Sequence, residues 1–219
     1  MTDKIRIAID GPSGAGKSTI AKNVARILHI DYIDTGAMYR AIGYKIQQSN
    51  IALTDREALK RILLNTEIDF VEGDIILDGA IINDRIRTPE ISKMASDVSA
   101  LSEVREKLVV LQRNMGQRKS VVMDGRDIGT NVLKDAEFKF FVTASPAERA
   151  RRRWLELTAK GEPAKLEQVE EDIIQRDHND STRALNPLKK AEDAVELDTT
   201  GLNIEEVTQK ILEVVKWQS

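Results

Sequence analysis

The strongest chemical signal in this chain is the glycine-rich segment GPSGAGKS, which runs from Gly11 to Ser18. It matches the pattern GxxxxGK(S/T) at every fixed position and lies between a predicted strand and a predicted helix, the context that the pattern requires. The glycines let successive backbone N–H groups point at phosphate oxygens, and the positive end of the following helix adds to the attraction. We therefore expect a nucleoside triphosphate here, with Lys17 bridging its β- and γ-phosphates. The alternative, a chance glycine turn that caps a helix, is disfavoured by the strand–loop–helix context.

Magnesium is the cation expected beside this loop. Its expected ligands are the Ser18 hydroxyl and Asp124, a carboxylate at the end of the apolar run VVMD that would orient the ion through water. Asp124 could instead cap its turn or pair with Arg126, and the sequence leaves these alternatives open. The residues expected to bind the nucleotide are Gly11, Pro12, Ser13, Gly14, Ala15, Gly16, Lys17, Ser18 and Thr19.

Arginines gather after the predicted strand ends, or flank the loops beyond them. Guanidinium groups there suit a site that neutralises two phosphate-bearing ligands and the charge on a transferring phosphoryl group. Arg149, Arg152 and Arg153 share one helical face ahead of the segment KGEPAK, which favours a mobile lid. A solvated helix face is the alternative for such a charge run. The groups expected to act on the phosphoryl group are Lys17, Arg126, Arg149, Arg152 and Arg153.

No residue stands out as a catalytic base. A phosphate acceptor is already ionised near neutral pH and needs no deprotonation, whereas a sugar or alcohol acceptor usually needs a positioned carboxylate. The sequence therefore predicts direct transfer from phosphate to phosphate without a general base. A nucleotide-dependent switch has weak support, because the guanine-reading pattern NKxD does not occur and DTTG, at 198–201, follows the last predicted strand.

Composition sets the broad class of the protein. The 219 residues are 41% apolar and 32% charged, which is typical of a packed globular protein rather than a disordered chain. A net charge of -3 disfavours a nucleic-acid partner, because proteins that bind duplexes usually carry a basic excess. With no cysteine and two histidines, the chain holds no cysteine-ligated metal site and needs no oxidising compartment. The amino terminus contains no secretory or membrane-spanning run, so we expect a cytoplasmic protein without a membrane partner. We also expect a monomer.

The elements that position these residues alternate between strands and helices. Apolar runs predict strands at 5–10, 120–125, 138–145 and 194–198, and periodic apolar positions predict helices at 17–28, at 146–159 and through 207–215. Ser145 and Glu148 are expected to form a capping box around Pro146, and NIEE to cap the last helix. This alternation indicates an α/β fold with a doubly wound parallel sheet.

The middle of the chain breaks this alternation. Residues 68–83, IDFVEGDIILDGAIIN, contain short apolar segments separated by EGD and DGA, which are typical of tight turns. We expect an antiparallel hairpin or three-stranded meander, followed by a helix that begins at TPE, residues 88–90. This segment predicts a subdomain at 64–100, inserted in a core of residues 1–63 and 101–219 that carries the lid at about 151–166.

Five segments, in this order and spacing, make the chain resemble the bacterial cytidylate kinases: IDGPSGAGKST, DTGAMYRA, MDGRDIGT, ERARRR and RDHNDSTR. The similarity runs from about residue 5 to the end. The phosphate loop is shared by many kinases, but DTGAMYR together with DGRDIGT is close to diagnostic. The resemblance implies the nucleoside monophosphate kinase fold, with a parallel core, a short lid and an enlarged monophosphate-binding insert rich in antiparallel strands, which the meander at 68–83 fits.

The resemblance also implies roles for residues that spacing alone would not select. Those implied to hold the acceptor phosphate are Thr35, Arg40, Arg126 and Arg183, with Thr35 standing where the family often has serine. Those implied to read the cytosine edge are Ser96, Arg105 and Asp127, and those implied to bind the sugar hydroxyls are Arg176 and Asp180. The implied activity is phosphorylation of CMP, and of dCMP, by ATP with Mg²⁺. A kinase for UMP, AMP or another small acceptor is the alternative within this fold, and a nucleotide-dependent switch or a nucleic-acid-binding ATPase is the alternative outside it.

Overall fold

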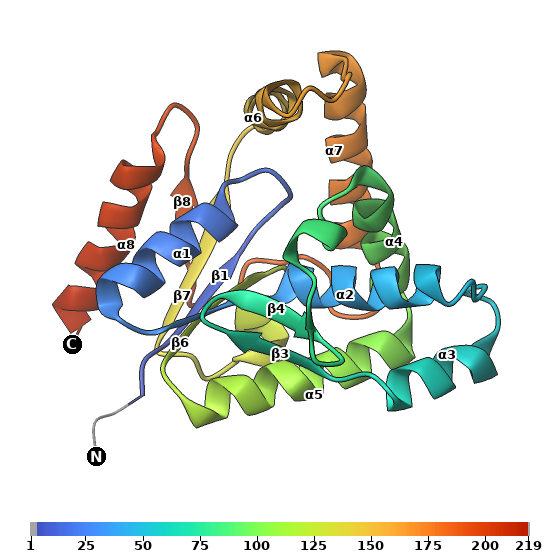
Figure 1. Ribbon diagram of the computed structural model, residues 1–219. Helices are drawn as coiled ribbons and strands as arrows, with labels where there is room; N and C mark the ends of the chain where they lie inside the picture. The colour runs from blue at the N-terminus through green and yellow to red at the C-terminus, as the bar shows by residue number, and fades with distance from the viewer. Residues whose placement is uncertain (1–3, 219) are drawn as a thin grey trace. The chain divides into compact units, whose positions relative to one another are not determined.

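The computed structural model describes residues 4–218, whose contacts group them into two compact units (Figure 1). One unit contains residues 4–32 and 120–218, and the other contains residues 33–119. The first unit therefore includes the glycine-rich segment and every predicted strand of the parallel sheet. The predicted subdomain at 64–100 lies inside the second unit, and its limits stay a prediction.

The first unit is built around a parallel sheet. Its elements are β1 (Arg6–Asp10), α1 (Lys17–Leu28), β6 (Val121–Gly125), β7 (Phe138–Thr143), α6 (Pro146–Ala159), α7 (Leu166–Thr182), β8 (Val195–Asp198) and α8 (Ile204–Gln218), with a short π-helical turn, η2, at Ile128–Val132. Among the described residues the sheet has five strands in the order β2-β6-β1-β7-β8, where β2 (Asp31–Asp34) leads from the first unit into the second. Strand β1 pairs in parallel with β6 and β7, and β7 with β8, which confirms the predicted α/β class.

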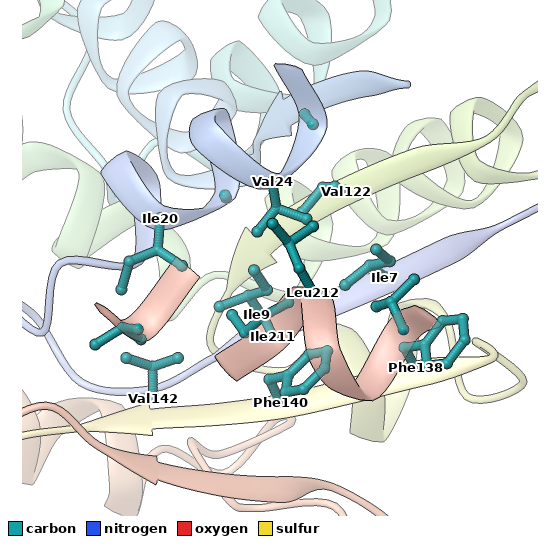
Figure 2. Close-up of a cluster of buried hydrophobic side chains, with 14 of the residues drawn as sticks. Ile7, Ile9, Ile20, Val24, Val122, Phe138, Phe140, Val142, Ile211 and Leu212 are labelled. Carbon is teal, nitrogen blue, oxygen red and sulfur yellow. The ribbon is translucent and has the colours of Figure 1, made fainter. Parts of the chain in front are cut away.

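The core of this unit lies between the sheet and the helices α1 and α8, as Figure 2 shows. Side chains alternate along a strand, so every second residue of β7 can face these helices. Phe138, Phe140 and Val142 do so, and they pack with Ile7 and Ile9 of β1. The helices contribute Ile20, Val24, Ile211 and Leu212. Burial of this apolar surface holds β1 and α1 in place, and the glycine-rich segment connects them.

Two predicted helix caps have different outcomes. At the start of α8 the Asn203 side chain accepts the N–H of Glu206 at 2.9 Å, and the Glu206 carboxylate accepts the N–H of Asn203 at 2.8 Å, which confirms the NIEE cap. At the start of α6 the Ser145 hydroxyl accepts the N–H of Glu148 at 3.2 Å. The second bond of the predicted capping box, from the Ser145 N–H to the Glu148 carboxylate, does not form, so that part of the prediction was wrong. The Ser145 N–H donates to Thr200, because the Glu148 carboxylate is held by two arginines of its own helix.

The second unit contains helices and a small antiparallel sheet. Its elements are α2 (Thr35–Gln48), α3 (Arg56–Leu64), β3 (Ile68–Val71), β4 (Asp74–Leu77), β5 (Ala80–Ile81), the 3₁₀ turn η1 (Asn83–Ile86), α4 (Pro89–Ser99) and α5 (Ser102–Arg118). The sheet order β3-β4-β5 is antiparallel, which confirms the predicted meander. Both turns place two residues at positive φ, Glu72 with Gly73 and Asp78 with Gly79, as tight two-residue hairpins need. Thr88 caps α4, with Pro89 at its first turn, as predicted.

The sequence patterns did not identify β2 or the helices α2, α3, α5 and α7 as elements. No helix in the part of the chain that the structure describes is long and apolar enough to span a membrane.

We predict that Phe140→Ala lowers the free energy of unfolding by about 3–5 kcal/mol, because it opens a cavity in a close-packed core. Phe140 is 1% exposed. Phe141→Ala is the matched control, since Phe141 is half-buried on the opposite face of the same strand and should cost less. Urea unfolding with an unchanged m-value measures both losses. Equal losses for the two variants would contradict this placement of the core.

Candidate active site

The glycine-rich segment forms a loop between β1 and α1, as the sequence predicts. Gly11 has a φ of 147°, and a Cβ atom there would overlap the carbonyl oxygen of Val142 on β7. Gly16, with a φ of 85° and ψ of 4°, is the left-handed residue that leads into α1. Glycine is therefore required at both positions, for close approach at one and for backbone conformation at the other.

Lys17 is buried at the first residue of α1, and its Nζ donates to the carbonyl oxygen of Pro12 at 2.6 Å. Burial, together with the positive charges of Arg126 and Arg176, lowers the pKa of Lys17 to about 7 against the opposing effect of Asp124. A phosphate group beside Lys17 would favour its charged form and raise this pKa again.

Asp124, the last acidic residue of β6, receives two hydroxyl hydrogen bonds. Ser18 Oγ donates to its Oδ2 at 2.9 Å, and Tyr32 Oη donates to its Oδ1 at 2.8 Å. A serine oxygen and a carboxylate within one hydrogen bond are hard oxygen donors of the kind that Mg²⁺ takes, usually together with water and phosphate oxygens. The pair therefore fits the predicted magnesium position. In the described part of the chain no cluster of three or more His, Cys, Asp or Glu residues could hold a metal ion by itself.

The segment after β6, which carries Arg126 and Asp127, is fastened to β1. Both oxygens of Asp10, the last residue of β1, accept backbone N–H groups, from Ile128 at 2.8 Å and from Gly129 at 2.7 Å. Burial raises the pKa of Asp10 to about 6, although the two N–H groups favour the ionised form. The strand end that begins the phosphate loop thus also fixes the segment with Arg126.

Helix α7 brings the predicted acceptor-side residues of this unit together. Arg126 Nε lies 2.8 Å from Asp180 Oδ2, and Arg183 Nη2 lies 3.2 Å from Asp127 Oδ1. Arg183 Nη1 is also 3.9 Å from Asp180 Oδ1. Burial alone would raise the pKa of Asp180, but the charges of the neighbouring arginines outweigh it and lower that pKa. Arg176 lies one turn before Asp180 on the same helix, at the predicted i, i+4 spacing.

The three arginines of α6 have different surroundings. Arg149 is buried, and its guanidinium donates to the carbonyl oxygens of Ala144 and Ser13. Arg152 pairs with Glu148 and donates to Thr199, in the segment after β8. Arg153 pairs with Glu156 on its own helix. Of these three arginines, Arg149 is the one that donates to the phosphate loop.

The second unit contains the other predicted acceptor-side residues. Thr35 is buried at the start of α2, where the Asp34 side chain caps the helix by accepting the N–H of Ala37 at 2.8 Å and pairs with Arg40 Nη2 at 2.8 Å. Arg105 of α5 is also buried, and its guanidinium carbon lies 5.7 Å from the centroid of the Tyr39 ring. Ser99 connects the predicted cytosine-reading residues, because its carbonyl accepts from Arg105 at 3.4 Å and its hydroxyl donates to the Ser96 carbonyl at 2.8 Å.

Sequence reasoning missed the supporting roles of Asp10, Tyr32 and Asp34. Asp10 and Asp34 are the last residues of β1 and β2, so their signal was a polar residue where an apolar strand stops. Tyr32 lies within β2 and carries no such signal. Strand ends of a parallel sheet share one edge, and polar residues there contact one another across long sequence separations.

The chain matches the family model for cytidylate kinase over residues 7–217. A cytidylate kinase of Alkaliphilus oremlandii is 51% identical over 212 residues, which cover 97% of this chain and 98% of that protein. A cytidylate kinase of Caldicellulosiruptor saccharolyticus is 54% identical over 215 residues, which cover 96% of this chain and 95% of that protein. A solved structure of an uncharacterized protein from Eubacterium ventriosum shares the fold, with a TM-score of 0.55 and 13% identity over 98% of this chain and 99% of that chain. A match over nearly the full length, with the motif residues gathered as described, means that the chain belongs to the cytidylate kinase family.

Proposed function

We propose that this chain transfers the γ-phosphoryl group of ATP to CMP, and to dCMP, with Mg²⁺, giving ADP and the cytidine diphosphate. The observation that carries the proposal is geometric: Ser18, the residue after Lys17, donates to Asp124 at 2.9 Å, and Arg126 follows Asp124 by two residues. A donor-phosphate lysine and an arginine suited to an acceptor phosphate therefore lie within reach of one another. Phosphoryl transfer between two anions needs this concentration of cations.

The phosphate loop supplies the donor side. Its backbone N–H groups and the N-terminus of α1 bind the ATP phosphates, and Lys17 bridges the β- and γ-phosphates. Ser18 and Asp124 would hold Mg²⁺, which neutralises phosphate charge when bound. Tyr32 keeps the Asp124 carboxylate oriented through its 2.8 Å hydrogen bond.

The acceptor side relies on arginines paired with carboxylates. In the first unit, Arg126 and Arg183 are assigned to the CMP phosphate and Asp127 to the cytosine edge. In the second unit, Thr35 and Arg40 are assigned to the CMP phosphate, and Ser96 and Arg105 to the cytosine edge. Arg176 and Asp180 bind the sugar hydroxyls. An ionised carboxylate suits this last role, because its hydrogen bonds to hydroxyls are charge-assisted.

Transfer proceeds without a general base. The carboxylates of the first unit near the loop already have partners: Asp10 accepts backbone N–H groups, Asp124 accepts hydroxyls and Asp180 pairs with Arg126. The CMP phosphate is ionised near neutral pH, so its oxygen can attack directly while the arginines stabilise the charge. Arg152 and Arg153, in the lid proposed at 151–166, act on the same charge when the lid closes.

A kinase for another small acceptor is the second candidate, because a phosphate loop of this kind does not select the acceptor. We predict ADP formation with CMP and dCMP that exceeds formation with UMP, AMP or no acceptor by at least about tenfold in kcat/KM. A coupled ADP assay over this panel measures it. A preference for UMP or AMP would reassign the acceptor, and equal ADP formation without any acceptor would favour an ATPase.

We predict that Lys17→Met lowers kcat at least about 100-fold, because it removes a charge that stabilises the transferring phosphoryl group. The melting temperature should not fall, since burial already disfavours the Lys17 charge in the folded protein. Steady-state kinetics beside a melting curve test both statements. Near-normal turnover in the variant would contradict the donor role of Lys17.

The lowered pKa of Lys17 also predicts proton uptake on ATP binding. At pH 8 a lysine of pKa about 7 is mostly neutral, and bound phosphate raises that pKa, so binding takes up a fraction of a proton that approaches one. ATP affinity should accordingly fall as the pH rises above 7. Calorimetry at pH 8 in two buffers of different ionisation enthalpy measures the uptake, and Lys17→Met should abolish it. Equal heats in both buffers for the native chain would refute this linkage.

We predict that Asp180→Ala lowers kcat/KM for CMP and dCMP by about tenfold or more, because each substrate loses a charge-assisted hydrogen bond and Arg126 loses its partner. ATP affinity should hardly change. Asp172→Ala is the matched control, since Asp172 is exposed on the same helix and accepts a hydrogen bond from the exposed Gln168 side chain. A lower melting temperature with unchanged kinetics on the folded fraction would give Asp180 a purely structural role.

A further inference from the structure

Arg149 connects segments that are distant in the sequence. Its side chain, on a residue only 3% exposed, donates through Nε to the Ala144 carbonyl at 2.9 Å and through Nη1 to the Ser13 carbonyl of the phosphate loop at 2.9 Å. Its Nη2 pairs with Asp177 of α7 at 2.6 Å. One guanidinium thus joins the end of β7, the phosphate loop and α7.

The phosphate loop also rests on the Arg149 backbone and Cβ. A Cβ atom at Gly14 would lie 3.1 Å from the Arg149 Cβ and 3.3 Å from its carbonyl oxygen, closer than ordinary packing allows. The loop therefore passes directly over Arg149 at Gly14 and is hydrogen-bonded to it at Ser13. This contact is independent of the guanidinium bonds and places Arg149 beneath the loop.

On the α7 side the connection depends on Asp177. Its Oδ2 accepts from Arg149, and its other carboxylate oxygen is buried without a hydrogen-bond partner among the described residues. Asp177 follows Arg176 directly and lies less than one turn before Asp180. Apolar packing of Ala150 on Val169 and Ile173 holds α6 on α7, but does not reach the phosphate loop.

We propose that Arg149 is a positioning residue, which sets the phosphate loop and the sugar-binding part of α7 at a fixed separation and does not touch either nucleotide. This inference rests on the proposed function. It removes Arg149 from the residues expected to act on the phosphoryl group and gives Asp177 a role that the sequence motifs did not assign.

The guanidinium is suited to this role by its shape. Arginine presents its donors in a rigid planar fork, so one side chain can serve acceptors in several directions at once. The ammonium of a lysine is a compact charge on a flexible stem and cannot span the same acceptors. Arg149→Lys therefore keeps the charge and removes the geometry, which separates a positioning role from a charge effect.

The experiment compares Arg149→Lys, Asp177→Ala and their double variant with Arg151→Lys as the matched control. Arg151 lies on the same helix, is exposed and pairs with Glu148. For each variant the ATP dissociation constant is measured by calorimetry without acceptor, and kcat and KM for CMP are measured at saturating ATP, beside a melting curve.

We expect Arg149→Lys to weaken ATP binding and kcat/KM for CMP by about tenfold each, because both connections are lost. Asp177→Ala should leave ATP affinity within about twofold, since the Ser13 bond remains, and lower kcat/KM for CMP by about tenfold through KM. The double variant should be no worse for CMP than Arg149→Lys, because the two residues act as one unit. Arg151→Lys should stay within about twofold throughout.

Other patterns would overturn the proposal. A loss of kcat in Arg149→Lys with both affinities intact would make Arg149 a catalytic residue, and a change confined to the melting temperature would make the pair purely structural. If Arg149→Lys does not fold, Asp177→Ala decides, because its side chain is partly exposed and its loss leaves the loop contact in place. If the native chain does not phosphorylate CMP, the proposed function fails, while the ATP measurements still test the connection to the loop.

Discussion

The first unit depends on one constraint: positive charge concentrated beside the phosphate loop has to be stable inside the protein. Arg126, Arg149 and Arg183 meet it by pairing with buried or half-buried carboxylates, at 2.8 Å for Arg126 with Asp180 and 2.6 Å for Arg149 with Asp177. Lys17 is accommodated inside the protein in a different way. Burial and the arginine charges lower its pKa, and it donates to a backbone carbonyl instead of a carboxylate. Each buried cation without a partner would lower the stability of the folded protein by several kcal/mol. The carboxylates of α7 are therefore as necessary as the arginines themselves.

This constraint explains why the strand ends are so closely connected. Asp10 ends β1 and accepts the N–H groups of Ile128 and Gly129, so the segment that carries Arg126 cannot move independently of the phosphate loop. Gly129 makes this possible, because a Cβ atom there would lie 3.4 Å from Asp10 and 3.2 Å from Lys139. The carboxylate is therefore held by the backbone on one side and close packing on the other. A parallel sheet favours such an arrangement, since its strands end at a shared edge.

The parts of this structure that could be predicted from the sequence have strong local signals. The phosphate loop, the strands β1, β6, β7 and β8 of the parallel sheet and the turns at Gly73 and Gly79 each depend on a few adjacent residues. Helix α7 was not recognised as an element, because Val169 and Ile173 are its only buried apolar residues and their spacing alone does not indicate a helix. The partners of Arg149 could not be predicted either, because Ser13 is 136 residues away in the sequence and Asp177 is 28 residues away. Side-chain partners at such separations follow from the topology, which local patterns do not encode.

The contacts that Arg126 and Lys17 make within the protein also influence which ligands can bind to them. A ligand phosphate that binds Arg126 competes with the Asp180 carboxylate, and one that binds Lys17 competes with the Pro12 carbonyl. Binding is favourable only for a ligand that carries more negative charge than the protein group it displaces. A weakly charged or neutral ligand would replace a strong hydrogen bond with a weaker one. A phosphate dianion satisfies this condition and an alcohol does not. Under the proposed function, the pairing that stabilises the cations therefore also disfavours acceptors without a phosphate.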